Sequence, residues 1–122
     1  MNINFYDDPN DRPVMREDVR IRDIMLEVSP EGRRVAVDLE LTPFIERPSI
    51  QIAIVNGNGE PAGSSTIIET LDHKFGLVVH LRDREPTEEY QVTVMAYYTS
   101  LEEGARQVVH QLTKGFTVNR ED

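Results

Sequence analysis

Histidines and clustered carboxylates are the residues of this sequence whose chemistry suits metal binding or catalysis. The histidines are His73, His80 and His110, and a metal site needs at least two of them to converge with carboxylates. His80 and His110 fall in runs that alternate apolar and polar residues, in which successive side chains point to opposite faces of a strand. His80 has the parity of solvent-facing positions, whereas His110 shares the parity of Val108 and Leu112. We therefore interpret both as structural histidines on different faces.

Oxygen ligands also crowd the start of the chain, where Asp7, Asp8, Asn10 and Asp11 lie within five residues. Carboxylate and amide oxygens suit calcium. However, Pro9 interrupts the group, and the glycine and the distal glutamate of an EF-hand loop are missing. A solvated acidic arm is the simpler interpretation, and a calcium site that uses Asp7, Asp8 and Asp11 is the alternative.

The sequence shows no catalytic constellation. Asp38, Glu40 and Glu69 have the parity of solvent-facing strand positions, which does not suit a pair of buried carboxylates with divergent pKa values. Ser64 and Ser65 have no nucleophile-elbow context and no histidine near them in sequence. The chain contains no cysteine, which excludes disulfides, thiolate nucleophiles and cysteine-ligated zinc. We expect a protein that is not an enzyme and that needs no cofactor.

Length and charge narrow the class of protein further. A chain of 122 residues is one domain by length, and its 13 basic and 22 acidic residues give a formal net charge of −9. Such a chain repels nucleic acid and anionic membranes, and its basic residues are dispersed, with Arg33 and Arg34 as the only adjacent pair. We find no signal peptide and no long apolar run, so we expect a cytoplasmic protein without membrane insertion.

The dominant hydrophobic period is two residues, and its breaks fall at Pro, Gly, Asn and Asp, which predicts an all-β domain of about seven strands. In the first run, Val19 and Ile21 have one parity and Ile24 has the other, so a β-bulge is expected near Arg22 and Asp23. The Asn-Gly pairs in 56–59 predict a tight hairpin. The expected strands lie in the runs 19–28, 33–42, 49–56, 65–71, 74–82, 86–99 and 107–118.

The run 86–99 also carries a family resemblance. Pro86-x-x-x-Tyr90-x-Val92-x-Val94-x-Ala96 resembles strand F of fibronectin type III domains, in which a tyrosine corner begins the strand. The resemblance implies a seven-stranded antiparallel sandwich of the immunoglobulin or fibronectin III type over 19–120, preceded by an N-terminal arm, 1–18. It also implies that the Tyr90 hydroxyl bonds the backbone within 82–86. A small β-barrel is the structural alternative.

In such a sandwich, strands C, F and G are neighbours, and their outward positions here carry no charge. The opposite sheet instead presents Arg20, Asp38, Glu40 and Lys74. An uncharged surface with exposed apolar side chains is typical of a protein interface. We therefore predict a protein-interaction or assembly module, which binds itself as a homo-oligomer or binds another protein. The residues predicted to contact the partner are Ala53, Val55, Met95, Tyr97 and Val109.

Two alternatives accompany this prediction. In the first, Met95 and Tyr97 are simply covered by the N-terminal arm or by the loop 101–106, and the arm itself is held by its own sheet or by a neighbour's edge. In the second, the protein is a calcium- or carbohydrate-binding β-sandwich module that uses the acidic arm or loop residues such as Tyr6 and Phe44.

Overall fold

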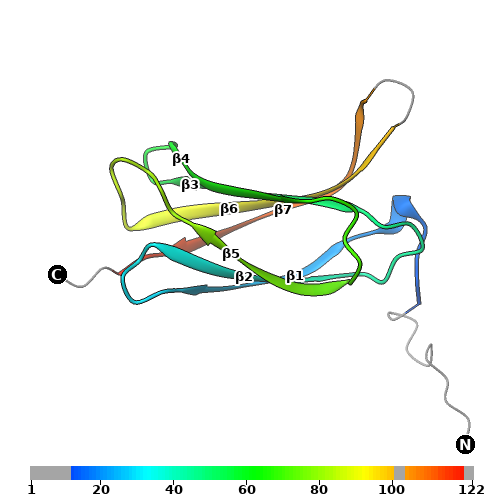
Figure 1. Cartoon of the computed structure of the whole chain (residues 1–122), viewed down its shortest axis with the longest axis horizontal. Coiled ribbons are helices and arrows are strands. Elements are labelled where there is room, and N and C mark those ends of the chain that lie inside the picture. Colours follow the sequence, from blue (N-terminus) through cyan, green and yellow to red (C-terminus); the bar gives the residue numbers. More distant parts are fainter. Residues whose placement is uncertain (1–11, 101–103, 120–122) are drawn as a thin grey trace, which may run out of the picture.

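The computed structural model describes residues 12–100 and 104–119 and forms a β-sandwich (Figure 1). One antiparallel sheet has the order β1-β2-β5 and the other the order β4-β3-β6-β7. The predicted all-β sandwich of about seven strands is therefore confirmed, and two separate sheets rather than one closed ring distinguish it from a small barrel. The strands are β1 (Ile21–Val28), β2 (Arg34–Leu41), β3 (Ser49–Asn56), β4 (Pro61–Ile67), β5 (Lys74–His80), β6 (Glu89–Thr99) and β7 (Arg106–Thr117).

The core lies between the two sheets and is built from one parity of each strand. Ile50, Ile52 and Ile54 of β3 are almost completely buried, as the alternation predicted. β-branched side chains fit this setting because they pack well on a pleated surface. The other predicted core positions that are buried are Val35, Val37, Leu39, Leu41, Val79, Leu81, Tyr90, Val92, Val94, Ala96 and Tyr98, while Phe75 and Leu77 are half-buried against them.

Three register shifts interrupt the ladders in the described part of the chain, and one of them lies between Ile54 and Val55 where β3 pairs with β4. The other two are β-bulges that correct the parity of the chain where the sequence alternation slips. The register of β1 on β2 shifts between Ile21 and Asp23, which confirms the bulge predicted near Arg22. A second shift lies in the β6–β7 ladder, where Ala96 pairs with His110 but Tyr97 pairs with Val108. Because the extra residue in β7 is Val109, strict alternation assigns the wrong faces to residues 108 and 109.

β1 and β7 lie at the same side of the sandwich and are joined by polar contacts. The His110 Nδ1 atom accepts a hydrogen bond from the Ile21 N–H at 2.8 Å, and Lys114 Nζ donates to the Ile24 carbonyl at 2.6 Å. Partial burial lowers the pKa of His110, and the positive charge of Arg20 adds to the effect. His110 is therefore a structural hydrogen-bond acceptor in its neutral form.

The segment that precedes β1 is held by the chain's own β2–β3 connection. The Val14 N–H donates to the Pro43 carbonyl at 3.0 Å, and the Ile45 N–H donates to the Val14 carbonyl at 3.1 Å. A short 3-10 helix, η2 (Arg16–Asp18), follows. The calcium alternative, Asp7, Asp8 and Asp11, lies outside the described residues. Over 12–100 and 104–119, no helix has the length and apolar character needed to cross a membrane.

The core accounts for the first prediction. Ile52→Ala removes a side chain that is 0% exposed and should lower the free energy of unfolding by about 2–5 kcal/mol. Ile68→Ala is the matched control, because Ile68 is 67% exposed, and it should change stability by about 0.5 kcal/mol or less. Urea unfolding followed by circular dichroism measures both. Equal losses of unfolding free energy in the two variants would show that the buried side chains of β3 do not dominate the stability of the core.

Candidate functional site

The five residues predicted to bind a partner do not form one surface. Ala53, Val55 and Met95 point outward from the β4-β3-β6-β7 sheet and are half-buried. Val109 is the bulged residue of β7 and packs against the core, so its predicted place on the outer face is wrong. The local reason is the extra residue, which turns the Val109 side chain away from the face where alternation had put it.

Tyr97 points outward but is only 2% exposed, so its predicted exposure at the patch is also wrong. The guanidinium of Arg106 lies 4.4 Å from the centre of the Tyr97 ring, and the same guanidinium donates a hydrogen bond to Gln51. Arg106 is the first residue of β7 and the last residue of the segment 101–106, which was the alternative cover for this tyrosine. The cation packs on the aromatic face and shields it from water.

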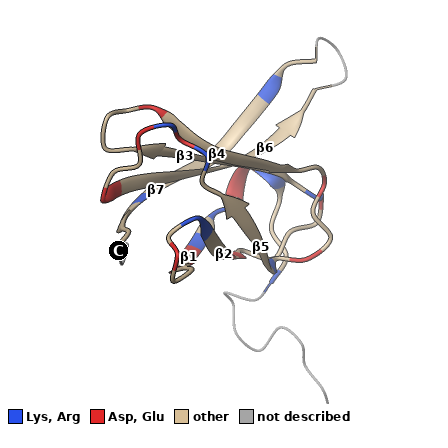
Figure 2. Ribbon diagram, turned by 60° about the vertical axis from the view of Figure 1, so that its left-hand side comes forward, with Lys and Arg blue, Asp and Glu red and all other residues tan. Residues whose placement is uncertain are grey.

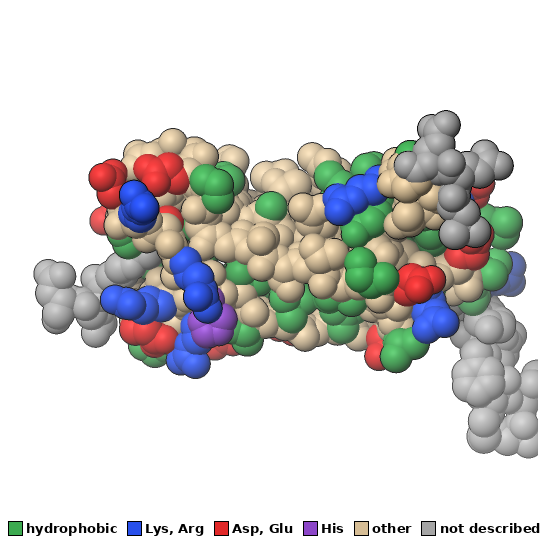
Figure 3. All heavy atoms as spheres, turned by 45° about the horizontal axis from the view of Figure 1, so that its top comes forward, with side chains coloured by type: hydrophobic (Ala, Val, Ile, Leu, Met, Phe, Trp, Pro, Cys, Tyr) green, Lys and Arg blue, Asp and Glu red, His purple; other side chains and the backbone are tan. Residues whose placement is uncertain are grey.

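Apart from the Arg106 guanidinium that bonds Gln51, the outward positions in the middle of the four-stranded sheet are nevertheless uncharged. In Figure 2 the middle of this sheet is almost free of charged positions, and Figure 3 shows a central surface of uncharged side chains between charged groups at both ends. The β1-β2-β5 sheet differs, since Glu40 lies 3.7 Å from Arg22 and 3.9 Å from Lys74 in ion pairs. We call the following positions the outer sheet face: Gln51, Ala53, Val55, Ser64, Thr66, Thr93, Met95, Gln111 and Thr113.

Tyr90 lies at the start of β6 and is 2% exposed. Its hydroxyl donates to the Asp83 carboxylate at 2.9 Å and accepts from the Thr87 N–H at 3.4 Å. Asp83 also accepts from the Asn56 side-chain amide at 3.0 Å. The hydroxyl therefore does reach the predicted segment 82–86, but its partner there is a carboxylate instead of a backbone group. This network is structural, because it ties the β3–β4 hairpin and the β5–β6 connection to β6.

Removal of the Tyr90 hydroxyl gives a second prediction. Tyr90→Phe leaves the buried end of this network without its donor to Asp83 and should lower the free energy of unfolding by about 1–3 kcal/mol. Tyr97→Phe is the control, because the Tyr97 hydroxyl has no hydrogen bond among the described residues. Chemical denaturation compares the two variants. A loss from Tyr97→Phe as large as that from Tyr90→Phe would contradict the structural role.

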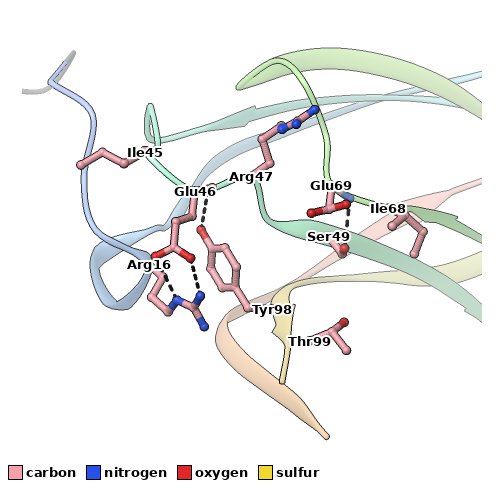
Figure 4. Close-up of a pocket in the computed structure, with 9 residues that line it drawn as sticks. All are labelled: Arg16, Ile45, Glu46, Arg47, Ser49, Ile68, Glu69, Tyr98 and Thr99. Carbon is pink, nitrogen blue, oxygen red and sulfur yellow. Dashed lines mark hydrogen bonds and ion pairs between the residues drawn. The ribbon is translucent and has the colours of Figure 1, made fainter. Parts of the chain in front are cut away.

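A pocket of about 560 Å³ opens at the end of the sandwich where the β2–β3 and β4–β5 connections meet β6 (Figure 4). Arg16 forms an ion pair with Glu46 on one side of it, and the Arg16 guanidinium lies 4.7 Å from the centre of the Tyr98 ring. The Tyr98 hydroxyl donates to the Glu46 carbonyl at 2.8 Å. On the other side, Glu69 has a left-handed backbone with φ of 49°, and its N–H donates to the Ser49 hydroxyl at 3.1 Å.

Ionisable groups that line this pocket, Glu46 and Tyr98 among them, have shifted pKa values. The hydrogen bond with Arg16 lowers the pKa of Glu46, so this carboxyl group is ionised and engaged. Burial raises the pKa of Tyr98 to about 12, which removes it as a proton carrier near neutral pH. The other lining groups are Ser49, Thr99, Arg47, Glu69 and two exposed isoleucines, which form no nucleophile–base pair.

The raised pKa of Tyr98 predicts an alkaline transition. The unfolded chain ionises Tyr98 near pH 10 and the folded chain near pH 12, so its contribution to stability is complete below pH 10 and declines as the pH rises toward 12. Tyr98→Phe should lack this part of the decline. Thermal melts from pH 8 to about pH 11, together with absorbance titration of the tyrosines, test the point. If the melting temperatures of the wild type and Tyr98→Phe fall equally with rising pH, the prediction is wrong.

The histidines do not converge. His80 is exposed at the end of β5, His110 contacts β1, and His73 lies in the β4–β5 connection, where its carbonyl accepts from the Leu41 N–H. Within the described ranges, no group of three or more histidine, aspartate or glutamate side chains is placed to hold a metal ion.

The fold does gather basic residues that the sequence analysis had treated as dispersed. Arg33 precedes β2, whereas Arg82 and Arg84 follow β5, and the Leu81 N–H donates to the Arg33 carbonyl at 2.7 Å. The signal in the sequence was the pairing of the two strands: antiparallel alignment of 34–41 with 74–80 places residue 33 beside residue 81. His80 pairs with Arg34 at the same corner.

Comparisons with known proteins identify the fold. No protein-family model matches the sequence, and no curated protein matches it. A β-glucuronidase from Bifidobacterium dentium is similar in structure, with a TM-score of 0.62 and 14% identity over 83% of this chain and 18% of the enzyme. A β-glucuronidase from Ruminococcus gnavus has a TM-score of 0.53 and 13% identity over 83% of this chain and 16% of the enzyme.

A third similar structure is a glycosyl hydrolase family 2 member from Bacteroides cellulosilyticus, with a TM-score of 0.57 and 12% identity over 82% of this chain and 15% of that chain. This chain thus spans less than a fifth of the length of these proteins. At such low identity the likeness shows a shared β-sandwich fold, and fold alone does not assign an activity.

Proposed function

We propose that this protein is a non-enzymatic interaction module that binds another protein chain, a second copy or a different protein, through the outer sheet face. The observation that carries the proposal is the lack of charge on that face in a chain with a formal net charge of −9. Charged groups cost several kcal/mol each when an interface removes them from water without a good partner. A partner can cover a face without charged groups at a lower cost in free energy.

The composition of the outer sheet face fits an interface core with a polar surround. Ala53, Val55 and Met95 supply apolar contact along β3 and β6. Around them lie amide and hydroxyl groups, among which Thr93 and Thr113 hydrogen-bond each other at 3.0 Å. Uncharged side chains of this kind are common where protein surfaces are flat and partly wet. Met95 is the most adaptable of them, because its thioether side chain has three rotatable bonds.

The similar structures support a modular role. In the three enzymes compared above, a sandwich like this one accounts for less than a fifth of a longer chain, so the fold is compatible with packing against other protein surfaces. In the four-stranded sheet, β3, β6 and β7 are neighbours, as the resemblance to fibronectin type III domains implies for strands C, F and G, and we assign the sandwich to that type as part of the proposal.

Carbohydrate binding is the second candidate. The outer sheet face is rich in uncharged hydrogen-bonding groups such as Gln51, Thr66 and Gln111, and the similar structures include a β-glucuronidase complexed with a glucuronide. Sugar rings, however, usually stack on exposed aromatic side chains, and Tyr97, the aromatic residue of this sheet's outer side, is covered by Arg106. This observation places protein binding first.

A pair of methionine substitutions tests the proposal. Met95→Glu puts a charge on the outer sheet face, whereas Met25→Glu puts the same charge on the other sheet, where Met25 of β1 is 59% exposed. Sedimentation velocity over a hundredfold concentration range measures self-association, and chemical cross-linking in the native extract measures capture of another protein. Met95→Glu should weaken the association at least about tenfold, and Met25→Glu should leave it unchanged.

The contrast between the variants decides the outcome. A complex that survives Met95→Glu, or that both substitutions weaken equally, would overturn the assignment of the interface. Binding of neutral oligosaccharides that Met95→Glu abolishes, in the absence of any protein complex, would favour the second candidate.

A further inference from the structure

A groove of about 580 Å³ runs between β4 and the end of β5 and borders the outer sheet face. Its walls are mainly aliphatic, and Val78 of β5 is 53% exposed there. Three of the lining residues, Ala53, Val55 and Ser64, also belong to the outer sheet face. We call this feature the edge groove, and the lining residues used below are Ala53, Val55, Gly63, Ser64, Val78 and Arg82.

The backbone around the edge groove suits an extended peptide. β4 and β5 are both terminal strands of their sheets, so each has a ladder on one side only, and a free strand edge can pair with another chain. The β4 edge already accepts one such bond, from the Arg82 N–H to the Ala62 carbonyl at 2.7 Å. At Gly63 the β4 edge already touches β5, because a Cβ atom there would lie 2.6 Å from the His80 carbonyl oxygen, so the edge open to a peptide begins at Ser64.

Arginines and carboxylates alternate at the end of the groove, in the sequence Arg82-Asp83-Arg84-Glu85. Arg33, Arg82 and Arg84, which we call the basic corner, are exposed, and none of them has an ion-pair partner within 12–100 and 104–119. Figure 3 shows basic side chains gathered with a histidine at the end of the molecule away from the N-terminus. The neighbouring Asp83 carboxylate accepts hydrogen bonds from Asn56 and Tyr90, so part of the local negative charge is already engaged.

The basic corner can attract anions despite the acidic chain. Salt screens charges that lie more than about 8–10 Å apart at physiological ionic strength, so the nearest arginines dominate the field at contact. A guanidinium also binds a carboxylate through two parallel hydrogen bonds, which makes arginine well suited to carboxylate recognition.

We propose that the edge groove and the basic corner together bind an extended acidic segment of the partner protein. The segment pairs its backbone with the β4 edge from Ser64 to Ile67 and places aliphatic side chains against Val78. Its carboxylates contact the basic corner. This inference rests on the proposed function as a protein-interaction module and adds the chemistry of the partner. An acidic polysaccharide or a nucleic acid could use the arginines, but neither would use the strand edge and the aliphatic walls.

The test is a fluorescence anisotropy titration of the full chain with a labelled peptide of eight residues that alternates glutamate and valine. Arg82→Ser/Arg84→Ser should weaken binding at least about tenfold. The matched control is Arg12→Ser/Arg47→Ser, which removes the same charge from two exposed arginines outside this corner and should leave binding within about twofold. A probe with glutamine in place of glutamate should bind at least about tenfold more weakly, and a probe with N-methylated backbone amides should also bind more weakly.

Several results would overturn the inference. The first is that the peptide does not bind at about 1 mM. The second is an equal loss of affinity in the two double variants, and the third is undiminished binding of the N-methylated probe. A heparin fragment or a single-stranded oligonucleotide of equal charge that binds as tightly as the peptide would reveal a general polyanion site instead.

Met95→Glu separates this inference from the proposed function. In one outcome, Met95→Glu still binds the peptide and still forms the protein complex. This result would reject the outer sheet face as the interface and retain the edge groove as the peptide site. Loss of the complex in Met95→Glu without any peptide binding by the wild type would retain the outer sheet face and reject the groove.

Discussion

The packing of two apolar sheet faces against each other is the constraint on which the rest of this structure depends. Ile50, Ile52 and Ile54 of β3 lie in the same buried layer as Val35 and Val37 of β2, and each strand can bury one parity only. Every side chain of the opposite parity is therefore directed outward. The core in this way decides which residues are left for binding, and each binding surface is the reverse side of a buried strand.

The two bulges show how strict this constraint is. In β1 the parity changes beside Arg22, and the extra residue keeps Ile21 and Ile24 both buried. In β7 the bulge at Val109 turns His110 toward β1 and leaves Val108 about half exposed. A one-residue shift exchanges the faces of all residues before it relative to those after it. For this reason the contents of an outer face depend on where a bulge falls.

The distribution of charge over the surface follows from the same packing constraint. The ends of the sandwich carry arginines and carboxylates. Some form ion pairs, such as Arg16 with Glu46, and the arginines of the basic corner have no ion-pair partner among the residues that the structure describes. The middle of the outer sheet face carries no charged residue. The two proposals use these two kinds of surface: an uncharged sheet that is inexpensive to cover, and a charged end beside a free strand edge that can select an acidic partner by its backbone and its carboxylates together.

The sequence by itself determined the all-β class, the positions of the strands except β4, which runs from Pro61 to Ile67 and not over 65–71, the buried parity of almost every strand, the first bulge and the segment that Tyr90 reaches. These features follow from local periodicity and turn chemistry, which are properties of neighbouring residues. Only the tertiary structure decided that Arg106 covers Tyr97, that Val109 is bulged, and that Arg33 lies with Arg82 and Arg84. Each of these depends on the register between strands that are distant in the chain, which hydrogen-bonded pairing and side-chain packing set and which single-strand alternation does not encode.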